Sequence, residues 1–214
     1  MSATGKSLLR QMKGAAGAQG PQLSLKIPGF EGYFLRPVAT GRENLDTVDI
    51  ACLTGWRNRH VNAFLTEFVA TDKRTSRWLS NVVHTDDSRI LFMIEDMQRV
   101  RVGYMGIAYI DWDCSYVEAD AIVSSGGTPK GMMSAALRTV LCWAKGQLGL
   151  KVVAVRVLSD NPALTFYRRL GFEETKRIPL KRVVSDDLVS WIEDTTLATS
   201  ERYLVHHLWN DHEN

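Results

Sequence analysis

The sequence predicts an α/β (α+β) protein with a mixed, mostly antiparallel sheet and helices on both faces of that sheet. Two observations predict this class. Three apolar segments separated by short turns follow one another over residues 89–123, which is typical of antiparallel strands joined as a meander. A long amphipathic helix then leads to a nearly continuous apolar strand at residues 152–158. A strand–helix–strand connection pairs its two strands in parallel, so we expect one parallel pair in the sheet.

The N-terminal half is expected to supply one strand, two helices and three further strands. Residues 33–37 predict the first strand, and residues 45–58 predict a helix because apolar side chains recur there at helical spacing. Thr71 is a candidate N-cap for a second helix over residues 72–83. The three antiparallel strands are expected at residues 89–95, 102–111 and 116–123.

The C-terminal half is expected to contain two helices and three strands. The long helix has one continuous apolar face, and Gly149 ends it before the strand at 152–158. Residues 163–170 predict a short helix that Gly171 closes. The remaining segments are a strand at 174–183, a connector with room for one helical turn at 186–194, and a strand at 203–209.

Residues 1–29 are expected to form a flexible N-terminal tail, and residues 30–214 a single domain. Small residues without periodicity fill the segment 14–21, which argues against regular structure. A short helix over residues 7–13 that contacts a partner is the less favoured alternative. A chain of 214 residues is long enough to bury a sizeable core as one domain.

Composition argues against several classes of protein. The formal net charge is only +2, without a basic stripe, so we expect no nucleic-acid partner. Cys52, Cys114 and Cys142 are far apart and odd in number, which argues against a disulfide framework and against a metal site. The sequence shows neither a membrane-length apolar run nor a secretory signal. We therefore expect a cytoplasmic protein with no membrane partner and no metal.

A glycine-rich segment, Ser-Ser-Gly-Gly-Thr-Pro-Lys-Gly over residues 124–131, lies between a predicted strand and the long helix. Glycines let the backbone approach a phosphate closely, and the N–H groups and dipole at a helix N-terminus attract it. Lys130 adds a positive charge. A Walker loop fits poorly because Lys130 precedes Gly131 and no hydroxyl follows it. The segment therefore predicts a site for a phosphate-bearing cofactor.

A second motif follows the strand at 152–158. Asn161 comes first, and Tyr167, Gly171 and Phe172 follow it in the spacing Tyr-x-x-x-Gly-Phe. With the glycine-rich segment, this motif resembles the acyl-CoA N-acyltransferases of the GNAT superfamily, and in particular members that modify amino sugars and other small molecules. The resemblance extends over residues 34–208. The segment has Ser124 where the family commonly has arginine or glutamine, which leaves Lys130 as its cation.

The resemblance implies the GNAT fold, with a six- to seven-stranded sheet and a splayed central parallel pair, and it implies acetyl-CoA as cofactor. It assigns the pantetheine arm and an oxyanion donor to the backbone of Ile122 and Val123. Either Asn161 or Asp160 takes the role of the family's asparagine. The other expected cofactor-binding residues are Gly126, Gly127, Thr128, Lys130, Gly131, Met132, Ala163 and Phe166.

Three side chains are the catalytic candidates. The resemblance makes Tyr167 the acid that protonates the leaving CoA thiolate, since a phenol with a pKa of about 10 stays protonated at neutral pH. Regular alternation would place Glu118, Asp120 and Ile122 on one face of their strand. A carboxylate on that face can attract an ammonium group and accept its proton, so Asp120 and then Glu118 are favoured as the base. The alternative is that both carboxylates face solvent.

The acceptor is expected to be a primary amine of a small molecule that attacks the thioester directly, and the resemblance favours an amino sugar or a nucleotide-linked amino sugar. Two other functions are considered: acetylation of a protein N-terminus or lysine, and non-catalytic binding of acyl-CoA. Dimers are common in this fold, so a homodimer is one expectation. The expected substrate-binding residues are Trp56, Arg57, Phe68, Arg74 and Trp78.

Overall fold

The computed structural model describes residues 2–16 and 23–210. The chain divides into two compact units, each of which is described by itself. Unit 1 comprises Met1–Trp56 and Thr71–Val153, and unit 2 comprises Arg57–Ala70 and Ala154–Asn214. The prediction of a single domain over residues 30–214 stays a prediction.

Unit 1 contains a meander of antiparallel strands. Strands β4, β5 and β6 pair in chain order, which is the arrangement that the three apolar segments predict. The strands of the unit follow the order β1 (Leu25–Lys26), β2 (Tyr33–Pro37), β4 (Ile90–Asp96), β5 (Arg101–Asp111) and β6 (Tyr116–Ser124).

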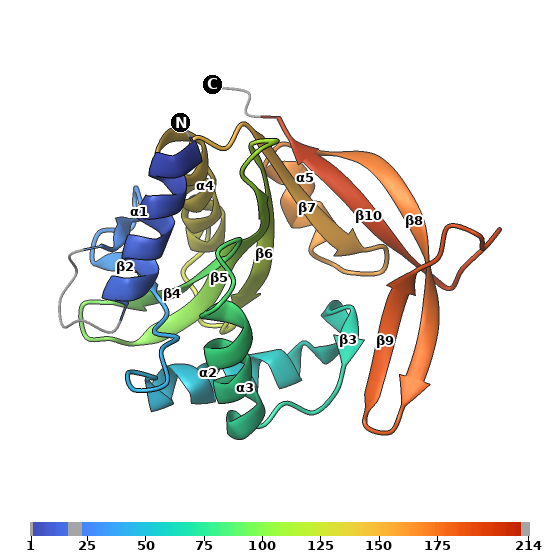
Figure 1. Ribbon diagram of the computed structural model, residues 1–214, viewed down its shortest axis with the longest axis horizontal. Helices are drawn as coiled ribbons and strands as arrows, with labels where there is room; N and C mark the ends of the chain where they lie inside the picture. Colours follow the sequence, from blue (N-terminus) through green and yellow to red (C-terminus); the bar gives the residue numbers. More distant parts are fainter. Residues whose placement is uncertain (1, 17–22, 211–214) are drawn as a thin grey trace. The chain divides into compact units, whose positions relative to one another are not determined.

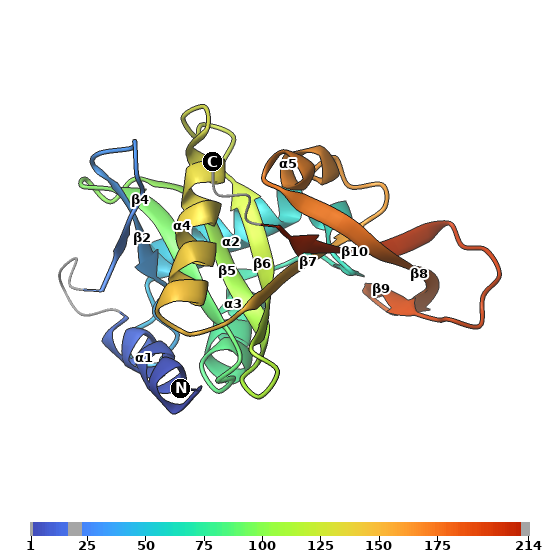
Figure 2. The same cartoon turned by 90° about the horizontal axis from the view of Figure 1, so that it is seen from above.

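Helices cover both faces of this part of the sheet. In Figure 2, α4 lies over one face of β4, β5 and β6, and α2 and α3 lie behind the other face. The apolar face of α4 is buried, and Trp143 meets Phe92 of β4 edge to face at 5.5 Å. Thr71 accepts the backbone N–H of Arg74, which confirms the predicted N-cap. The bounds are α2 Thr47–Arg59, α3 Asp72–Trp78 with a π-helical turn at Leu79–Val83, and α4 Met132–Gly146.

The N-terminal segment differs from the predicted tail. Ser2–Ala15 forms helix α1, which lies beside α4 in both views (Figures 1 and 2). A Cβ built at Gly5 would lie only 2.2 Å from the carbonyl oxygen of Leu148, so α1 packs closely against the segment that follows α4. Leu9 and Met12 are buried. The tail prediction is therefore wrong for residues 2–16. It is also wrong for residues 23–29, where β1 pairs with β2 and Ile27 is buried, while residues 17–22 lie outside the described residues.

A cluster of buried charges joins four elements of unit 1. Arg36 Nη2 donates to both carboxylate oxygens of Asp49 at 2.9 Å, and its Nε donates to Glu95 at 2.9 Å. Arg101 donates to Asp49 at 3.1 Å and to Asp46 at 2.9 Å. Asp49 and Glu95 are each only 1% exposed. The cluster thus ties β2, α2, β4 and β5 together through groups that water hardly reaches.

Unit 2 is built on a second run of antiparallel strands with one short helix. Its core contains Leu158, Leu180, Trp191 and Leu204, with Leu65 packed against them. Strands β8 and β9 form the long hairpin drawn in orange in Figure 1. The strand order is β7 (Val152–Leu158), β10 (Arg202–Trp209), β8 (Phe172–Ser185), β9 (Leu188–Glu193) and β3 (Thr66–Glu67), and α5 spans Leu164–Arg169.

The structure adds α1, β1, β3, a 3₁₀ turn at Val61–Ala63 and a strand in place of one connector, and the other elements agree with the predicted ones in type. Strand β9 occupies the segment 186–194, where the sequence predicts a connector with room for one helical turn. That prediction is wrong, because β9 pairs along its whole length with β8 and also receives β3 on its other edge. The predicted class, a mixed and mostly antiparallel α/β protein with helices, is confirmed.

Two general findings bear on function. None of the helices that the structure describes is long and apolar enough to cross a membrane. Among residues 2–16 and 23–210, no three side chains of the kinds that bind metals are placed together to hold an ion.

A buried histidine in unit 2 leads to a prediction about pH. His207 of β10 is fully buried between Val155 of β7 and Glu174 of β8, and burial lowers the pKa of its imidazole. The unfolded chain therefore binds a proton near pH 6.5 that the folded chain binds only at lower pH. Stability that is fully present above about pH 6.5 should be lost as the pH falls from there towards the folded pKa.

Urea unfolding at about pH 7.5 and about pH 5.5 measures this loss. We expect His207→Leu to reduce the fall in the free energy of unfolding between these two pH values, whereas His60→Leu, at an exposed histidine, should retain it. An equal pH dependence in His207→Leu and the unchanged protein would show that another group is responsible.

Candidate functional site

A β-bulge interrupts β6 in unit 1. Tyr104 of β5 pairs with Val123 and Gly106 pairs with Asp120, so Ala121 and Ile122 together stand opposite a single residue of β5. Ala121 has a φ of 54°, in the left-handed region that few residues other than glycine adopt. A bulge of this kind bends the strand and turns backbone groups out of the regular ladder. The structure thus places an irregular backbone where the resemblance expects the pantetheine arm to pair.

The bulge corrects one expectation about the faces of β6. Glu118, Asp120 and Val123 pair with residues of β5 that are two apart, and cross-strand partners share a face. The extra residue therefore moves Ile122 off the face that carries the two carboxylates and brings Val123 onto it. The prediction that Glu118, Asp120 and Ile122 share one face is wrong for Ile122, because it assumed regular alternation.

The two candidate bases differ in their surroundings. Glu118 is 7% exposed, and its carboxylate accepts the Tyr116 hydroxyl at 2.8 Å. Asp120 is half-buried, one step nearer to the bulge along the same face. A base must reach a proton on an acceptor, so the more accessible carboxylate is better suited. Asp120 is thus the more accessible of the two carboxylates, and the choice of base between them stays a prediction.

Serine and threonine hydroxyls organise the glycine-rich segment. The hydroxyls of Ser124 and Thr128 hydrogen-bond to each other, and Thr128 Oγ1 also donates to the carbonyl of Val102 at 2.9 Å. The backbone N–H of Gly126 donates to Ser124 Oγ at 3.2 Å. Ser124 therefore closes the loop by hydrogen bonding, which is a role that a long charged side chain at this position could not fill.

The same loop ends at the N-terminus of α4. Gly126 and Gly131 have φ values of 93° and 86°, which residues that carry a Cβ rarely adopt. Gly131 is the N-cap of the 15-residue helix, Met132 is fully buried and anchors its first turn, and Lys130 is exposed. Helix N–H groups, the helix dipole and a lysine together make a donor set that fits a diphosphate.

The second motif lies in unit 2. Asn161 Oδ1 accepts the backbone N–H of Ala163 at 2.9 Å, so this side chain shapes the turn that begins α5. The neighbouring carboxylate of Asp160 lies 2.7 Å from Arg202 Nη2. The structure thus gives Asn161 and Asp160 different partners: Asn161 holds the turn, and Asp160 forms an ion pair.

Tyr167 lies on α5 among aromatic rings. Its side chain is 7% exposed. Its ring meets Phe166 edge to face at 5.2 Å and Phe172 at 5.6 Å. These contacts hold the ring in a defined position through its apolar part, which is what an acid with a fixed hydroxyl requires.

The expected acceptor-binding residues fall into both units. In unit 1, Trp56 is buried and stacks on Tyr104 at 6.0 Å, while Arg74 and Trp78 are half-buried on α3. In unit 2, the Arg57 guanidinium lies 3.8 Å from the centroid of the Phe68 ring. Trp56 and Arg57 therefore have packing roles, and a role of any of the five in binding a substrate stays a prediction.

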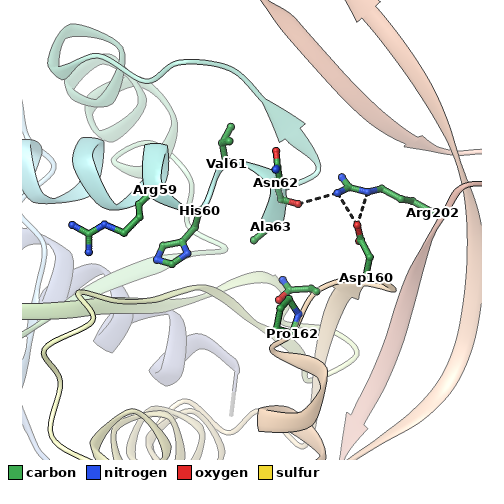
Figure 3. Close-up of a pocket in the computed structure, with 9 residues that line it drawn as sticks. Arg59, His60, Val61, Asn62, Ala63, Asp160, Pro162 and Arg202 are labelled. Carbon is green, nitrogen blue, oxygen red and sulfur yellow. Dashed lines mark hydrogen bonds and ion pairs between the residues drawn. The ribbon is translucent and has the colours of Figure 1, made fainter.

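Unit 2 contains a pocket that the sequence does not reveal. Its volume is about 340 Å³, within the range of small-molecule sites. Figure 3 shows the Arg202 guanidinium directed at Asp160 and at the main chain of Asn62. Asn62 and Arg202 are 140 residues apart in sequence, so no local pattern signals their approach. The pocket is lined by Arg59, His60, Val61, Asn62, Ala63, Asp160, Asn161, Pro162 and Arg202.

The glycine-rich loop and the tyrosine motif, on which the resemblance rests, point to one class of protein, the acyl-CoA-dependent transferases. The sequence matches the family model of the acetyltransferase (GNAT) domain over residues 34–173, and the chain belongs to this family. It is an acyl-CoA-dependent N-acetyltransferase, and its cofactor is acetyl-CoA. The predicted family, reaction class and cofactor are thereby confirmed.

Solved structures agree with this fold. A probable GNAT acetyltransferase from Chromobacterium violaceum superposes with a TM-score of 0.65 at 17% identity, over 92% of this chain and 95% of that chain. Spermidine N-acetyltransferase from Vibrio cholerae, in complex with CoA and spermine, has a TM-score of 0.63 at 16% identity, over 84% and 95%. The predicted GNAT fold is confirmed. A search of curated proteins found no match to this chain.

Proposed function

We propose that the protein transfers the acetyl group of acetyl-CoA to the primary amine of a small molecule. The observation that carries this proposal is the loop of residues 124–131, which follows a bulged strand and ends at the N-terminus of a 15-residue helix. When bound, acetyl-CoA supplies the activated thioester. Gly126, Gly131 and Lys130 are the residues proposed to hold its diphosphate.

The chemical roles proposed for the side chains follow from their surroundings. Asp120 attracts the ammonium form of the acceptor and accepts its proton, directly or through water. Tyr167 donates its phenolic proton to the leaving sulfur. A backbone N–H at the bulge, at Ile122 or Val123, hydrogen-bonds the developing oxyanion, which is worth roughly 3 kcal/mol for a well-aimed donor.

Two kinds of acceptor are proposed. An amino sugar or a nucleotide-linked amino sugar is the first, on the resemblance of the sequence. A polyamine is the second, because a structurally similar protein is a spermidine N-acetyltransferase whose structure contains spermine. Release of free thiol from acetyl-CoA, measured across amino sugars, sugar nucleotides, polyamines and peptides, separates these classes. Turnover with peptides alone would contradict the small-molecule proposal.

Acetyl-CoA is expected to raise the melting temperature of the protein. A ligand present at about 100 times its Kd and bound only by the folded state adds about 2.7 kcal/mol to stability. For a chain of this length that corresponds to about 5 to 10 °C. Differential scanning fluorimetry measures the shift. Pantetheine, which lacks the diphosphate, should give a smaller shift, and an unchanged melting temperature at millimolar acetyl-CoA would count against the proposed function.

A further inference from the structure

The pocket of unit 2 holds charged side chains at two ends. In Figure 3, Arg59 and His60 lie at one end, and Arg202 and Asp160 lie at the other. Arg59 and His60 come from the last turn of α2 and the residue after it, and both are exposed. The chemistry of each end decides what kind of ligand the pocket can take.

At its end of the pocket, Arg202 is paired with two carboxylates, Asp160 and Glu67. Arg202 donates to Asp160 from Nε at 2.9 Å and pairs with it from Nη2 at 2.7 Å. Its Nη1 donates to Glu67 of β3 at 2.9 Å, and its guanidinium lies 4.8 Å from the centroid of the Trp191 ring. Glu67 also accepts the Trp191 indole N–H at 2.8 Å. These contacts hold the Arg202 side chain in place, and it forms one wall of the pocket.

This pairing decides the charge that the pocket offers to a ligand. Asp160 is the one carboxylate among the described residues that line the pocket, and it is bound to Arg202. A cationic ligand would have to compete with that ion pair, in which two charge-assisted contacts hold the carboxylate. Arg59 and His60 are donors of N–H groups, which suit an anion.

We propose that this pocket binds an anionic group, a phosphate or a carboxylate, on the acceptor amine. Arg59 and His60 bind the anion, and Arg202 holds the opposite wall in place. Asn161 and Pro162 of the pocket belong to the turn that begins α5, the helix that carries Tyr167. The assignment of the anion to the acceptor rests on the proposed function, whereas anion binding in the pocket does not.

The inference narrows the choice of acceptor. An amino-sugar phosphate, a nucleotide-linked amino sugar or an amino acid carries both a primary amine and an anion. Spermidine and spermine carry cations only, and like charges juxtaposed across a site disfavour binding. The pocket thus favours a phosphorylated or nucleotide-linked amino sugar over a polyamine.

The test uses the full chain and inorganic phosphate as the probe, at constant ionic strength maintained with sodium chloride. The imidazole NMR signals of His60, assigned by their loss in His60→Gln, are followed as phosphate is added. We expect a saturable change in the unchanged protein. Arg59→Gln should weaken phosphate binding roughly 10- to 150-fold, as the loss of a charged hydrogen-bond donor predicts. Arg138→Gln, at an exposed arginine of α4, should leave it unchanged.

Further arms separate the sources of the anion. The titration is repeated with acetate in place of phosphate, which tells whether a carboxylate is also bound. It is then repeated with saturating CoA. Phosphate binding that persists with CoA supports the acceptor assignment, and displacement by CoA would overturn it in favour of a cofactor phosphate. The absence of any saturable change at His60, or equal affinity in Arg59→Gln, would overturn anion binding altogether. The melting shift with acetyl-CoA in the same samples reports on the proposed function separately.

Discussion

The Tyr167→Phe variant is expected to turn over acetyl-CoA about 10- to 1,000-fold more slowly than the unchanged protein, with little change in affinity for CoA. The substitution removes only the hydroxyl. Phenylalanine retains the edge-to-face contacts with Phe166 and Phe172, so the packing of α5 should survive. The measurement is kcat with the best amine of the acceptor panel, together with the Kd of CoA. A loss of turnover with an unchanged Kd is the pattern of a missing proton donor.

Tyr203→Phe is the matched control for this experiment. Tyr203 lies on β10 in the same unit, is half-buried, and uses its hydroxyl to accept the backbone N–H of Ser200. The Tyr203→Phe variant should be less stable by a few tenths to about 1.5 kcal/mol, and its turnover should be unchanged. Equal turnover in Tyr167→Phe and the unchanged protein would remove Tyr167 from the proposed chemistry.

Asp49→Ala is expected to lower the free energy of unfolding by about 3 to 5 kcal/mol. Asp49 is 1% exposed and receives hydrogen bonds from both Arg36 and Arg101, whose side chains are 12% and 10% exposed. Removing the carboxylate leaves two arginines in a poorly hydrated site with too few negative partners, and an uncompensated buried charge is costly. Chemical unfolding in urea, with ΔG extrapolated to water, measures the loss.

Two further variants test whether the loss of stability comes from the buried ion pair. Asp113→Ala, at an exposed carboxylate, should change stability by no more than about 0.5 kcal/mol. The double variant Asp49→Leu with Arg36→Leu should lose less than the sum of the two single changes, since it removes both members of a pair. If the single variant Asp49→Ala unfolds like the unchanged protein, Glu95 and Asp46 alone suffice to compensate the two arginines.

Much of the fold could be predicted from local patterns. The run at Val152–Leu158 is nearly continuously apolar, and β7 has the bounds expected for it. Thr71 signals the start of α3 by its own hydrogen bond. Such features need only neighbouring residues, which is why they can be read from a single sequence.

The wrong prediction for α1 depends on contacts between distant segments. Gly5 and Gly14 lower the helix propensity of α1, and it is the packing of Gly5 against Leu148 that gives this helix a surface to cover. For α1, the tertiary environment overrides a weak local preference. The segment of β9 does carry residues that favour a strand, Val189, Trp191 and Ile192, and its hairpin pairing with β8 is local, so this strand could have been predicted from the sequence.

The site was predictable in part. The resemblance to the GNAT family rests on residues that the sequence displays directly, and the family and the cofactor are confirmed. The pocket around Arg202 could not be predicted, because its walls come from distant segments: Arg202 and Asn62, which touch there, are 140 residues apart. The individual roles of Tyr167, Asp120 and the loop residues, a homodimer and a cytoplasmic location stay predictions.

The extra residue at Ala121 and Ile122 has a consequence for protein engineering. Deleting one of these two residues would remove the register shift that lies opposite Tyr104 to Gly106 of β5. Asp120 and Val123 would then be two positions apart, so the side chains on both flanks of the deletion would keep their present faces. Such a shortened chain should keep its fold but lose acetyl transfer, because it lacks only the bent backbone that is proposed to bind the oxyanion. Homologous sequences of this strand should accordingly be aligned from each end inwards, with any gap confined to these two positions.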